Sequence, residues 1–371
     1  MKIFNVVGAR PNFMKISPLL QEMKKHRTIK PLLIHTGQHF DNNMSDVFFR
    51  DLKIPKPDIH LGVSTGTQAE QTAKIMVNFE KTCLKERPDL VVVVGDVNST
   101  LACSLTAAKL CIPLAHVEAG LRSFDRTMPE EINRVITDAL SNFLFTTCKD
   151  ADRNLLKEGI PKKKIHFVGN VMIDTLLKFK SVAMNRAEIK IKKNSYAIVT
   201  LHRPSNVDNE DIFKNLLEAL VRISKTIPII FPAHPRTQKQ IKAFDCEDSF
   251  DFSKLTSINS LNLRKSIHIL NPLPYLEFLN LMSNARLVFT DSGGIQEETT
   301  ILGIPCLTIR ENTERSITIK KGTNILVGTD SRKIIMETQN ILSGKNKSGK
   351  IPRLWDGKAA ERIVKILLKR L

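Results

Sequence analysis

The sequence predicts an α/β fold made of two Rossmann-like, doubly wound domains with a cleft between them. A chain of 371 residues with 42% hydrophobic residues is long and apolar enough for two cores. Short apolar runs alternate with amphipathic runs, which is typical of parallel strands joined by helices. The alternation pauses in a Lys-rich segment near residues 179–195 and then restarts. We therefore expect a first domain over 1–170, a second over 171–355, and a C-terminal helix over 356–371 that can pack back on the first domain.

In the first half, apolar runs of strand length alternate with runs whose apolar residues recur at helical spacing. The expected strands cover residues 2–7, 30–35, 89–95, 112–118, 143–147 and 164–169. The expected helices cover residues 11–25, 42–52, 99–110, 129–140 and 151–158. A strand, a helix and a further parallel strand form the repeating unit of a doubly wound sheet, so this half is expected to be one such sheet.

The second half repeats the alternation. The expected strands cover residues 196–202, 228–234, 266–271, 286–291, 304–309 and 324–328. Helices are expected to begin near residues 208, 235, 274 and 293, with a last pair of helices after residue 328. Residues 246–264 fit neither pattern, and residues 344–352 have the polar, Lys- and Gly-rich composition of a surface loop.

The composition narrows the classes of function. A formal charge of +18 would attract partners that carry phosphate. However, the basic residues are spread along the whole chain without interleaved aromatic residues, and there are only one Trp and two Tyr, so we expect no nucleic-acid partner. A small anionic substrate suits this charge better. No stretch approaches the length of an apolar membrane span, so we expect no membrane contact and a cytoplasmic location.

The spacing of cysteine and glycine argues against two common kinds of site. The six cysteines show no CxxC spacing, so we interpret them as reduced thiols rather than as metal ligands. No GxGxxG motif follows an expected strand, which argues against a dinucleotide site. We therefore expect neither a metal ion nor a cofactor.

Two cations lie at the start of the first expected helix. Gly8 ends the first strand, and Pro11 opens the helix. Arg10 and Lys15 therefore flank the positive end of a helix at the carboxyl edge of the sheet, where phosphate groups bind. The alternative is that both cations only cap and solubilise the helix.

Carboxylates follow two further strands. Asp96 comes directly after one apolar strand, and Glu118 ends the next. Glu130 and Glu131 lie in the first turn of the following helix, where the helix dipole favours acidic residues for structural reasons alone. Asp96 can also cap a helix. More carboxylates gather at this edge than packing requires, so we interpret them as candidate acids and bases.

A histidine and an arginine follow the first strand of the second half. His202 and Arg203 lie in the turn after that strand. A histidine that titrates near neutral pH can bind a phosphate or transfer a proton. His234 follows another strand in the same way, and the residue pattern does not choose between the two histidines.

The segment TDSGGIQEET gives the sharpest signal for a ligand. Ser292 follows a strand and can cap the next helix. Gly293 and Gly294 leave backbone amides open to ligand oxygens, an arrangement that binds a diphosphate. Glu298 lies one helical turn later and can accept hydrogen bonds from a ribose, while Arg315 adds a cation from a later loop.

Taken together, these motifs resemble those of the non-hydrolysing UDP-N-acetylglucosamine 2-epimerases. The matching segments are GARPNFMK, HTGQHFDNNMSDVFF, GDVNST, HVEAGLRSFDRTMPEEINRVITD, LHRPSNVD, HPRT, TDSGGIQEET, GIPCLTIRENTER and GTNILVG. The resemblance covers residues 1–328. It implies a fold of the glycosyltransferase B type, UDP held mainly by the second domain, the sugar at the first-domain carboxylates, a homodimer and no nicotinamide cofactor.

The resemblance also implies roles for individual residues. The implied catalytic residues are Asp96, Glu118, Glu130 and His202, and which of them removes the proton stays open. The implied substrate-binding residues are Arg10, Lys15, Asp96, Glu118, His202, Leu273, Phe278, Ser292, Gly293, Gly294, Glu298 and Arg315. A second, regulatory substrate site of bacterial members resembles Gln38, Gln68, Glu131, Arg203 and His234, although Asp41 stands where those members carry Gln.

The implied reaction inverts the configuration at carbon 2 of the sugar by elimination and re-addition of UDP. The implied biological role is polysaccharide biosynthesis. Two alternatives use the same fold. One is a hydrolysing epimerase that releases UDP and N-acetylmannosamine. The other is the same reaction on a UDP-2,3-diacetamido uronic acid, because HTGQHFDNNMSDVFF also resembles those epimerases. A glycosyltransferase is a further alternative, but it has no evident use for carboxylates at both Glu118 and Glu130. The hypothesis of a basic nucleic-acid-binding protein is supported by the net charge alone.

Overall fold

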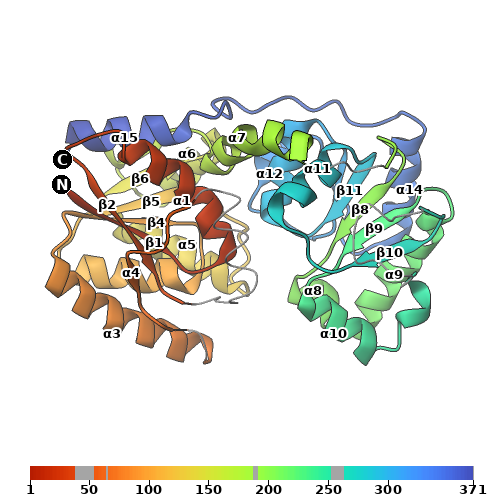
Figure 1. Cartoon of the computed structure of the whole chain (residues 1–371), viewed down its shortest axis with the longest axis horizontal. Helices are drawn as coiled ribbons and strands as arrows, with labels where there is room; N and C mark the ends of the chain where they lie inside the picture. Colours follow the sequence, from red (N-terminus) through yellow and green to blue (C-terminus); the bar gives the residue numbers. More distant parts are fainter. Residues whose placement is uncertain (38–53, 64–65, 187–190, 252–262, 371) are drawn as a thin grey trace. The chain divides into compact units, whose positions relative to one another are not determined.

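The computed structural model describes residues 1–37, 54–63, 66–186, 191–251 and 263–370. The chain forms two compact units (Figure 1). Unit 1 contains Met1–Lys178 and Arg353–Leu371, and unit 2 contains Phe179–Pro352. The helix expected over 42–52 lies outside the described residues.

Unit 1 is built on a parallel sheet with the strand order β3-β2-β1-β4-β5-β6-β7. Its strands are β1 (Lys2–Val7), β2 (Lys30–His35), β3 (Ile59–His60), β4 (Leu90–Val94), β5 (Leu114–Ala119), β6 (Phe143–Thr146) and β7 (Ile165–Phe167). Every pair of neighbours runs parallel. The central strand β4, LVVVV, is buried at every position, as a strand covered on both faces must be. The doubly wound sheet predicted for the first half is confirmed.

Helices cover the two faces of this sheet (Figure 1). They are α1 (Arg10–Met23), α3 (Gln68–Glu86), α4 (Asn98–Lys109), α5 (Pro129–Leu140), α6 (Lys149–Lys157), the 3-10 helix η1 (Lys162–Lys164), the start of α7 (Val171–Arg186) and α15 (Ala359–Arg370). Helix α7 continues into unit 2 from Phe179. Pro11 lies in the first turn of α1 and Pro129 in that of α5, where a missing N–H costs nothing. These two helix starts therefore agree with the sequence prediction.

The long helix α3 and the short strand β3 were not expected. The sequence does contain a helix signal, because the Thr67 side chain accepts from Glu70 N while the Glu70 side chain bonds back to Thr67 N. Ile75 and Phe79, one turn apart, are buried on the inner face of α3. Lys74 and Glu80, which flank this segment directly, interrupt the apolar pattern and hide the narrow stripe.

The C-terminal helix α15 belongs to unit 1 and packs against α1 (Figure 1). Its first N–H groups, those of Ala359 and Ala360, donate to the Asp174 carboxylate of α7 at 3.1 and 2.7 Å. The buried Trp355 donates its indole N–H to the Thr147 carbonyl at 2.9 Å. Along the chain, unit 2 is thus an insertion into unit 1, and its limits fall after Lys178 and at Pro352 rather than at 170 and 355.

Unit 2 repeats the architecture with a smaller parallel sheet of order β10-β9-β8-β11-β12-β13. Its strands are β8 (Ala197–Thr200), β9 (Ile229–Pro232), β10 (Ile267–Leu270), β11 (Leu287–Thr290), β12 (Cys306–Thr308) and β13 (Asn324–Leu326). Its helices are α8 (Pro204–Val207), α9 (Glu210–Ser224), α10 (Pro235–Ala243), the 3-10 helix η2 (Glu247–Ser249), α11 (Tyr275–Ser283), α12 (Gly293–Leu302), α13 (Ser316–Lys320) and α14 (Ser331–Leu342). None of the helices in the described part of the chain combines the length and hydropathy that a bilayer crossing demands.

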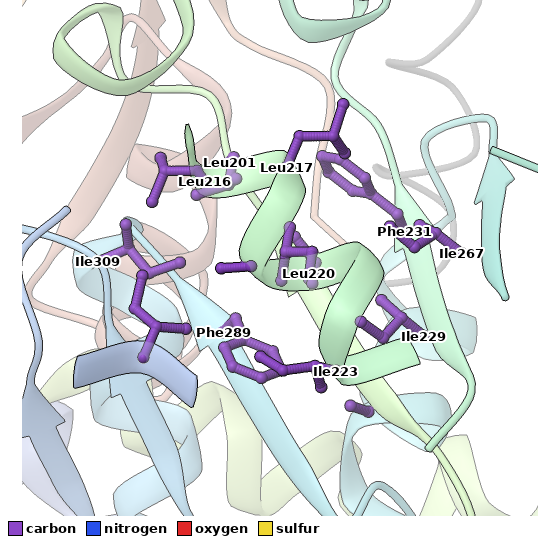
Figure 2. Close-up of a cluster of buried hydrophobic side chains, with 14 of the residues drawn as sticks. Leu201, Leu216, Leu217, Leu220, Ile223, Ile229, Phe231, Ile267, Phe289 and Ile309 are labelled. Carbon is purple, nitrogen blue, oxygen red and sulfur yellow. The ribbon is translucent and has the colours of Figure 1, made fainter. Parts of the chain in front are cut away.

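The core of unit 2 lies between α9 and the sheet. Leu220 and Ile223 of α9 face Ile229 of β9 and Phe289 of β11 (Figure 2). Each of these side chains is at most 4% exposed. Burying an aliphatic or aromatic side chain of this size stabilises a fold by about 1.5–3 kcal/mol, so α9 is firmly held on the strands that carry the site loops.

Candidate active site

Each sheet reverses its strand order once, between β1 and β4 in unit 1 and between β8 and β11 in unit 2. Ligands of doubly wound folds bind outside the carboxyl ends of the strands at such a switch point. The segments after β1 and β4 contain Lys15 and Asp96, and those after β8 and β11 contain His202 and Gly293. The topology therefore places these four expected site residues at the switch points, two in each unit.

The centre of the unit 1 site is a buried ion pair between Lys15 and Glu118. Lys15 Nζ lies 2.6 Å from Glu118 Oε2, and the two side chains are only 8% and 2% exposed. Glu118 has a left-handed backbone with φ of 73°, at the point where the pairing of β5 with β6 shifts register. Such a bulge re-aims a side chain. Gly95 makes room for the pair, because a Cβ there would lie 3.1 Å from Lys15 Nζ.

Asp96, the second candidate carboxylate, is held by Arg134 of α5. The Arg134 Nη1 group donates to the Asp96 carboxylate, and Asn133 donates its side-chain amide to the Asp96 carbonyl at 2.9 Å. Arg134 is 2% exposed, so its charge has no access to bulk water. Helix α5 thus fixes both the backbone and the side chain of the turn after β4.

Glu131 joins the same helix to the loop after β5. One carboxylate oxygen accepts from Arg134 Nη2 at 2.6 Å and from Ser123 N at 3.0 Å, and the other accepts from Phe124 N at 2.9 Å. Burial alone would raise the pKa of Glu131, but the hydrogen bonds from Ser123 and Arg134 outweigh it and the pKa is lowered. Both oxygens of this expected regulatory-site residue therefore bind groups of the protein itself.

A buried network behind the unit 1 site was missed by the sequence prediction. His116 Nδ1 lies 2.6 Å from Asp138 Oδ1, and His116 Nε2 lies 2.9 Å from the Gly95 carbonyl oxygen. Asp138 also accepts from Gly120 N at 3.0 Å and lies 2.7 Å from Arg122 Nη2. Burial would raise the pKa of Asp138, but the charges and hydrogen bonds of His116 and Arg122 outweigh it and lower the pKa. The network ties the turns after β4 and β5 to α5.

The other expected residues of unit 1 are Glu130, Gln68, Arg10 and Gln38. Glu130 is half-buried in the first turn of α5, and Gln68 is exposed at the first position of α3. Arg10 begins α1, but its side chain is outside the described part of the chain, as is all of Gln38. The structure thus brings together Lys15 and Glu118, and it leaves the places of Arg10 and Gln38 in the site as predictions.

The unit 2 site is organised around the buried Asp291. Its carboxylate accepts from the backbone N–H groups of His202 and Arg203 at 3.0 and 2.9 Å, and from the Asn206 side chain at 3.1 Å. His202 Nδ1 lies 3.1 Å from the same carboxylate, and the side chain of His202 is 41% exposed. The ring centroid of His234 lies 6.0 Å from that of His202. Asp291 therefore fixes the loop after β8 and orients the His202 ring.

The helix N-terminus after β11 has the expected glycines. Ser292 is the N-cap residue of α12 but its side chain makes no capping bond, which corrects the expectation that it caps. A Cβ on Gly293 would lie 2.9 Å from Glu314 Oε1 and 3.5 Å from Arg315 Nε, so these side chains pack close to the bare backbone. Arg315 Nε lies 2.8 Å from Glu297 Oε1. An anion at this helix start would meet open amides beside a guanidinium.

Glu298 lies deeper than the sequence pattern indicates. It is 2% exposed, and the Tyr275 hydroxyl of α11 donates to its Oε1 at 2.8 Å. Burial raises the pKa of Glu298 to about 7. Leu273 and Phe278, the expected uridine neighbours, are half-buried before and within the same helix α11. Tyr275 was not among the expected site residues, because a lone Tyr in an apolar helix is typical of a core position.

The chain was compared with known proteins. The sequence model of the family described as UDP-N-acetylglucosamine 2-epimerase matches residues 21–368. The UDP-N-acetylglucosamine 2-epimerase of Methanocaldococcus jannaschii is 45% identical over 99% of both chains. Its crystal structure in complex with UDP-GlcNAc and UDP is similar with a TM-score of 0.89, 44% identity and full coverage of both chains.

Two further relatives bear on specificity and fold. The UDP-2,3-diacetamido-2,3-dideoxy-D-glucuronate 2-epimerase of Pseudomonas aeruginosa is 39% identical over the full length of both chains. A lipopolysaccharide outer core galactosyltransferase is similar in structure alone, with a TM-score of 0.57 at 14% identity over the full length of both chains. This last similarity agrees with the two-domain glycosyltransferase B type of fold that the sequence predicts.

Proposed function

The chain belongs to the UDP-N-acetylglucosamine 2-epimerase family, and from this we propose that it interconverts UDP-N-acetylglucosamine and UDP-N-acetylmannosamine without hydrolysing either. The observation that carries the proposal is the 44% identity, over the whole of both chains, to an epimerase whose structure contains UDP-GlcNAc and UDP. The lower identity of 39% to the diacetamido-glucuronate epimerase makes that sugar the second candidate.

We assign the UDP to unit 2. The Gly293 and Gly294 amides at the start of α12, the Arg315 guanidinium and the half-exposed His202 ring are the groups that suit a diphosphate. Glu298, whose pKa of about 7 leaves half of it ionised at neutral pH, suits the ribose hydroxyls as an acceptor. These donors stabilise the negative charge on UDP as it leaves, which is the larger energetic demand of the reaction.

We assign the proton transfers at carbon 2 to the carboxylates of unit 1. A base removes the carbon 2 proton while the bond from carbon 1 to the UDP oxygen breaks, which leaves a double bond between carbons 1 and 2. A proton then returns to carbon 2 on the opposite face, and UDP adds back to carbon 1. Glu118 is the leading candidate for one of these steps, because the Lys15 ammonium at 2.6 Å fixes its position. Asp96 and Glu130 are the candidates for the other.

The fate of a hydrogen at carbon 2 tests the proposal. Purified protein is incubated with UDP-N-acetylglucosamine in deuterated water, without metal or nicotinamide, and the anomeric signals are followed by proton NMR. UDP-N-acetylmannosamine with deuterium at carbon 2 is the expected product. Free N-acetylmannosamine plus UDP would identify a hydrolysing enzyme instead. An absence of exchange would reject UDP-N-acetylglucosamine as substrate, and the same experiment would then use the UDP-2,3-diacetamido uronic acid.

Two finer properties stay predictions. A regulatory substrate site at Gln38, Gln68, Glu131, Arg203 and His234 predicts that UDP-N-acetylmannosamine alone is converted only slowly until UDP-N-acetylglucosamine is added. Glu131 Oε2 accepts from Ser123 and Arg134, whereas Oε1 accepts from Phe124 N and has a second lone pair, so Oε1 is the atom of Glu131 that suits a ligand in such a site. The homodimer implied by the sequence is tested by light scattering.

A further inference from the structure

Phe124, in the loop after β5, combines two unusual properties. Its side chain is 76% exposed, the highest exposed fraction among the large hydrophobic residues of the described chain. Its backbone is left-handed, with φ of 61°. A bulky residue with positive φ is a conformational outlier, and such outliers concentrate at sites where a ligand is held. Neither core packing nor solubility accounts for an aromatic ring presented to water from a strained backbone.

The surrounding structure holds this conformation in place. Glu131 accepts from the N–H of Phe124 at 2.9 Å and from the N–H and hydroxyl of Ser123 at 3.0 and 3.1 Å. The same Glu131 pairs with Arg134, whose other guanidinium nitrogen donates to Asp96. One buried guanidinium therefore fixes both the Phe124 loop and a candidate acid–base residue. A loop tip that served only as a connection would not need this support.

The position of the loop points to the sugar. Phe124 follows β5, whose end carries Glu118, and precedes the helix that carries Glu130. It therefore leaves the sheet at the carboxyl edge, beside the strand that ends at the unit 1 switch point. Within unit 1, the candidate groups on either side of it along the chain, Glu118 and Glu130, are ones proposed for proton transfer.

We propose that Phe124 is a specificity-determining residue whose exposed ring packs on the 2-acetamido sugar of the UDP-sugar. An aromatic face packs well against the C–H groups of a pyranose ring and the methyl group of an acetamide, which are the apolar parts of this substrate. The inference rests on the proposed function and deepens it. It predicts that Phe124 contributes to binding of the UDP-sugar and contributes nothing to binding of UDP.

The test compares Phe124→Asn with a matched control, Cys111→Asn. Asn tolerates the left-handed region better than Phe or Cys does, so both substitutions relieve backbone strain. Cys111 is also exposed and left-handed, with φ of 55°, but it lies before β5, at the opposite edge of the same sheet. Affinities for UDP and for the UDP-sugar are measured by calorimetry, KM and kcat by NMR, and stability by thermal unfolding.

We expect Phe124→Asn to raise the KM for the UDP-sugar about tenfold, with UDP affinity within twofold of wild type and an unfolding midpoint no lower than that of wild type. Cys111→Asn should leave both affinities unchanged. Loss of sugar affinity without loss of stability is a result that a purely structural residue cannot give. Phe124→Tyr should restore the KM, and Phe124→Leu, which keeps the strain but loses the ring, should not.

Two outcomes would overturn the inference: an unchanged KM in Phe124→Asn, or a loss of UDP affinity equal to the loss of UDP-sugar affinity. The second outcome would place the ring on the nucleotide. Failure of the proposed function is distinguishable, because it would appear in the wild type as absence of epimerisation, whereas the calorimetric comparison of UDP with the UDP-sugar needs no turnover. If the wild type does not bind UDP-N-acetylglucosamine, the comparison is made with the diacetamido uronic acid sugar.

Discussion

Asp138 of unit 1 and Asp291 of unit 2 are both fully buried, and each fixes loops at the carboxyl edge of its sheet. Their partners differ. Asp138 sits between the side chains of His116 and Arg122 and accepts from the backbone N–H of Gly120 in addition. Asp291 accepts from two backbone N–H groups and an amide side chain, with the partly exposed His202 ring beside it.

The two sites therefore differ in the groups that hold their loops in place. Unit 1 positions its carboxylates through ion pairs, Lys15 with Glu118 and Arg134 with Asp96, which fix the orientation of the groups that we propose for proton transfer. Unit 2 positions the loop after β8 mainly through neutral donors to Asp291, and its buried ion pair, Arg315 with Glu297, lies instead beside the Gly293 amide at the start of α12. We therefore expect substitutions in unit 1 to change turnover and those in unit 2 to change nucleotide affinity.

The largest effect should follow Glu118→Gln, which keeps an acceptor for Lys15 but removes the charge. We expect kcat to fall about 1,000-fold, within the range of 10²–10⁴ that acid–base groups contribute, while UDP affinity stays within about threefold. NMR turnover and calorimetry with UDP measure the two quantities. A loss of UDP affinity as large as the loss of kcat would erase the distinction between the units.

A matched pair of substitutions, Asp138→Asn and Asp291→Asn, tests the two kinds of support directly. Asp138→Asn removes the fully buried counter-ion of Arg122 and leaves Glu158 as its charged partner, so it should cost about 3 kcal/mol, the low end for a broken buried ion pair. Asp291→Asn weakens bonds to neutral donors and should cost about 1–3 kcal/mol. Trp355 is the single Trp, is buried and belongs to unit 1, so its fluorescence in a denaturant titration reports that unit.

Only Asp138→Asn should move the Trp355 transition to lower denaturant concentration. Circular dichroism, which detects both units, should show a second, earlier transition in Asp291→Asn. Equal shifts of the Trp355 transition in both variants would mean that the two aspartates support one cooperative structure, and the comparison between units would fail.

Acid should weaken unit 1 through His35, whose Nδ1 lies 2.9 Å from His60 Nε2. Burial, together with His60, lowers the pKa of His35 from 6.5 to about 4. A lowered histidine pKa means that the folded state binds fewer protons, so the contribution of His35 is intact above pH 6.5 and is lost as the pH falls toward 4. At pH 5 the loss is about 2 kcal/mol. Trp355 fluorescence of wild type and His35→Gln at pH 7 and pH 5 measures it, and equal pH dependence in the two proteins would reject the assignment.

The smallest expected effect concerns Glu298, whose pKa is raised by burial, whereas the pKa of His35 is lowered. The Glu298 pKa of about 7 is above the ordinary 4.5, so its burial costs stability as the pH rises through 7, while the carboxylate that can accept from a ribose becomes available. Because the ionised fraction of a group with this pKa rises tenfold between pH 6 and pH 8, UDP affinity should rise about tenfold over that range. Tyr275→Phe removes a bond to the charged form and should shift this rise to higher pH. Calorimetry across the range measures it, and a flat profile would remove Glu298 from the ribose.

Much of the fold was predictable because its signals are local. A short run of β-branched residues such as LVVVV favours a buried strand, and the alternation with helices around it indicates a parallel sheet. The residues after strand ends were predictable for the same reason, since parallel strands deliver their carboxyl ends to one edge. Asp96, Glu118, His202 and Gly293 all lie at such ends.

The supports of the site were not predictable because their partners are far apart in sequence. His116 and Asp138 are 22 positions apart, and each looks ordinary where it stands, as a polar residue in a strand and an acid in a helix. The left-handed backbone of Glu118 depends on a register shift that no residue type signals. The attachment of α15 depends on Asp174, which lies 185 positions before Ala359 in the sequence.

This return of the chain also sets an order of synthesis. On the ribosome, all of unit 2 emerges before Arg353–Leu371, the segment that supplies Trp355 and α15 to unit 1. Until α15 is made, helix α1 therefore lacks the helix that packs on it, and the Asp174 carboxylate lacks the Ala359 and Ala360 donors. Unit 2 can complete its own core during this time. The first strands to be made thus belong to the unit that is completed last. The apolar surface that α15 later covers on unit 1 therefore stays exposed on the nascent chain until synthesis ends.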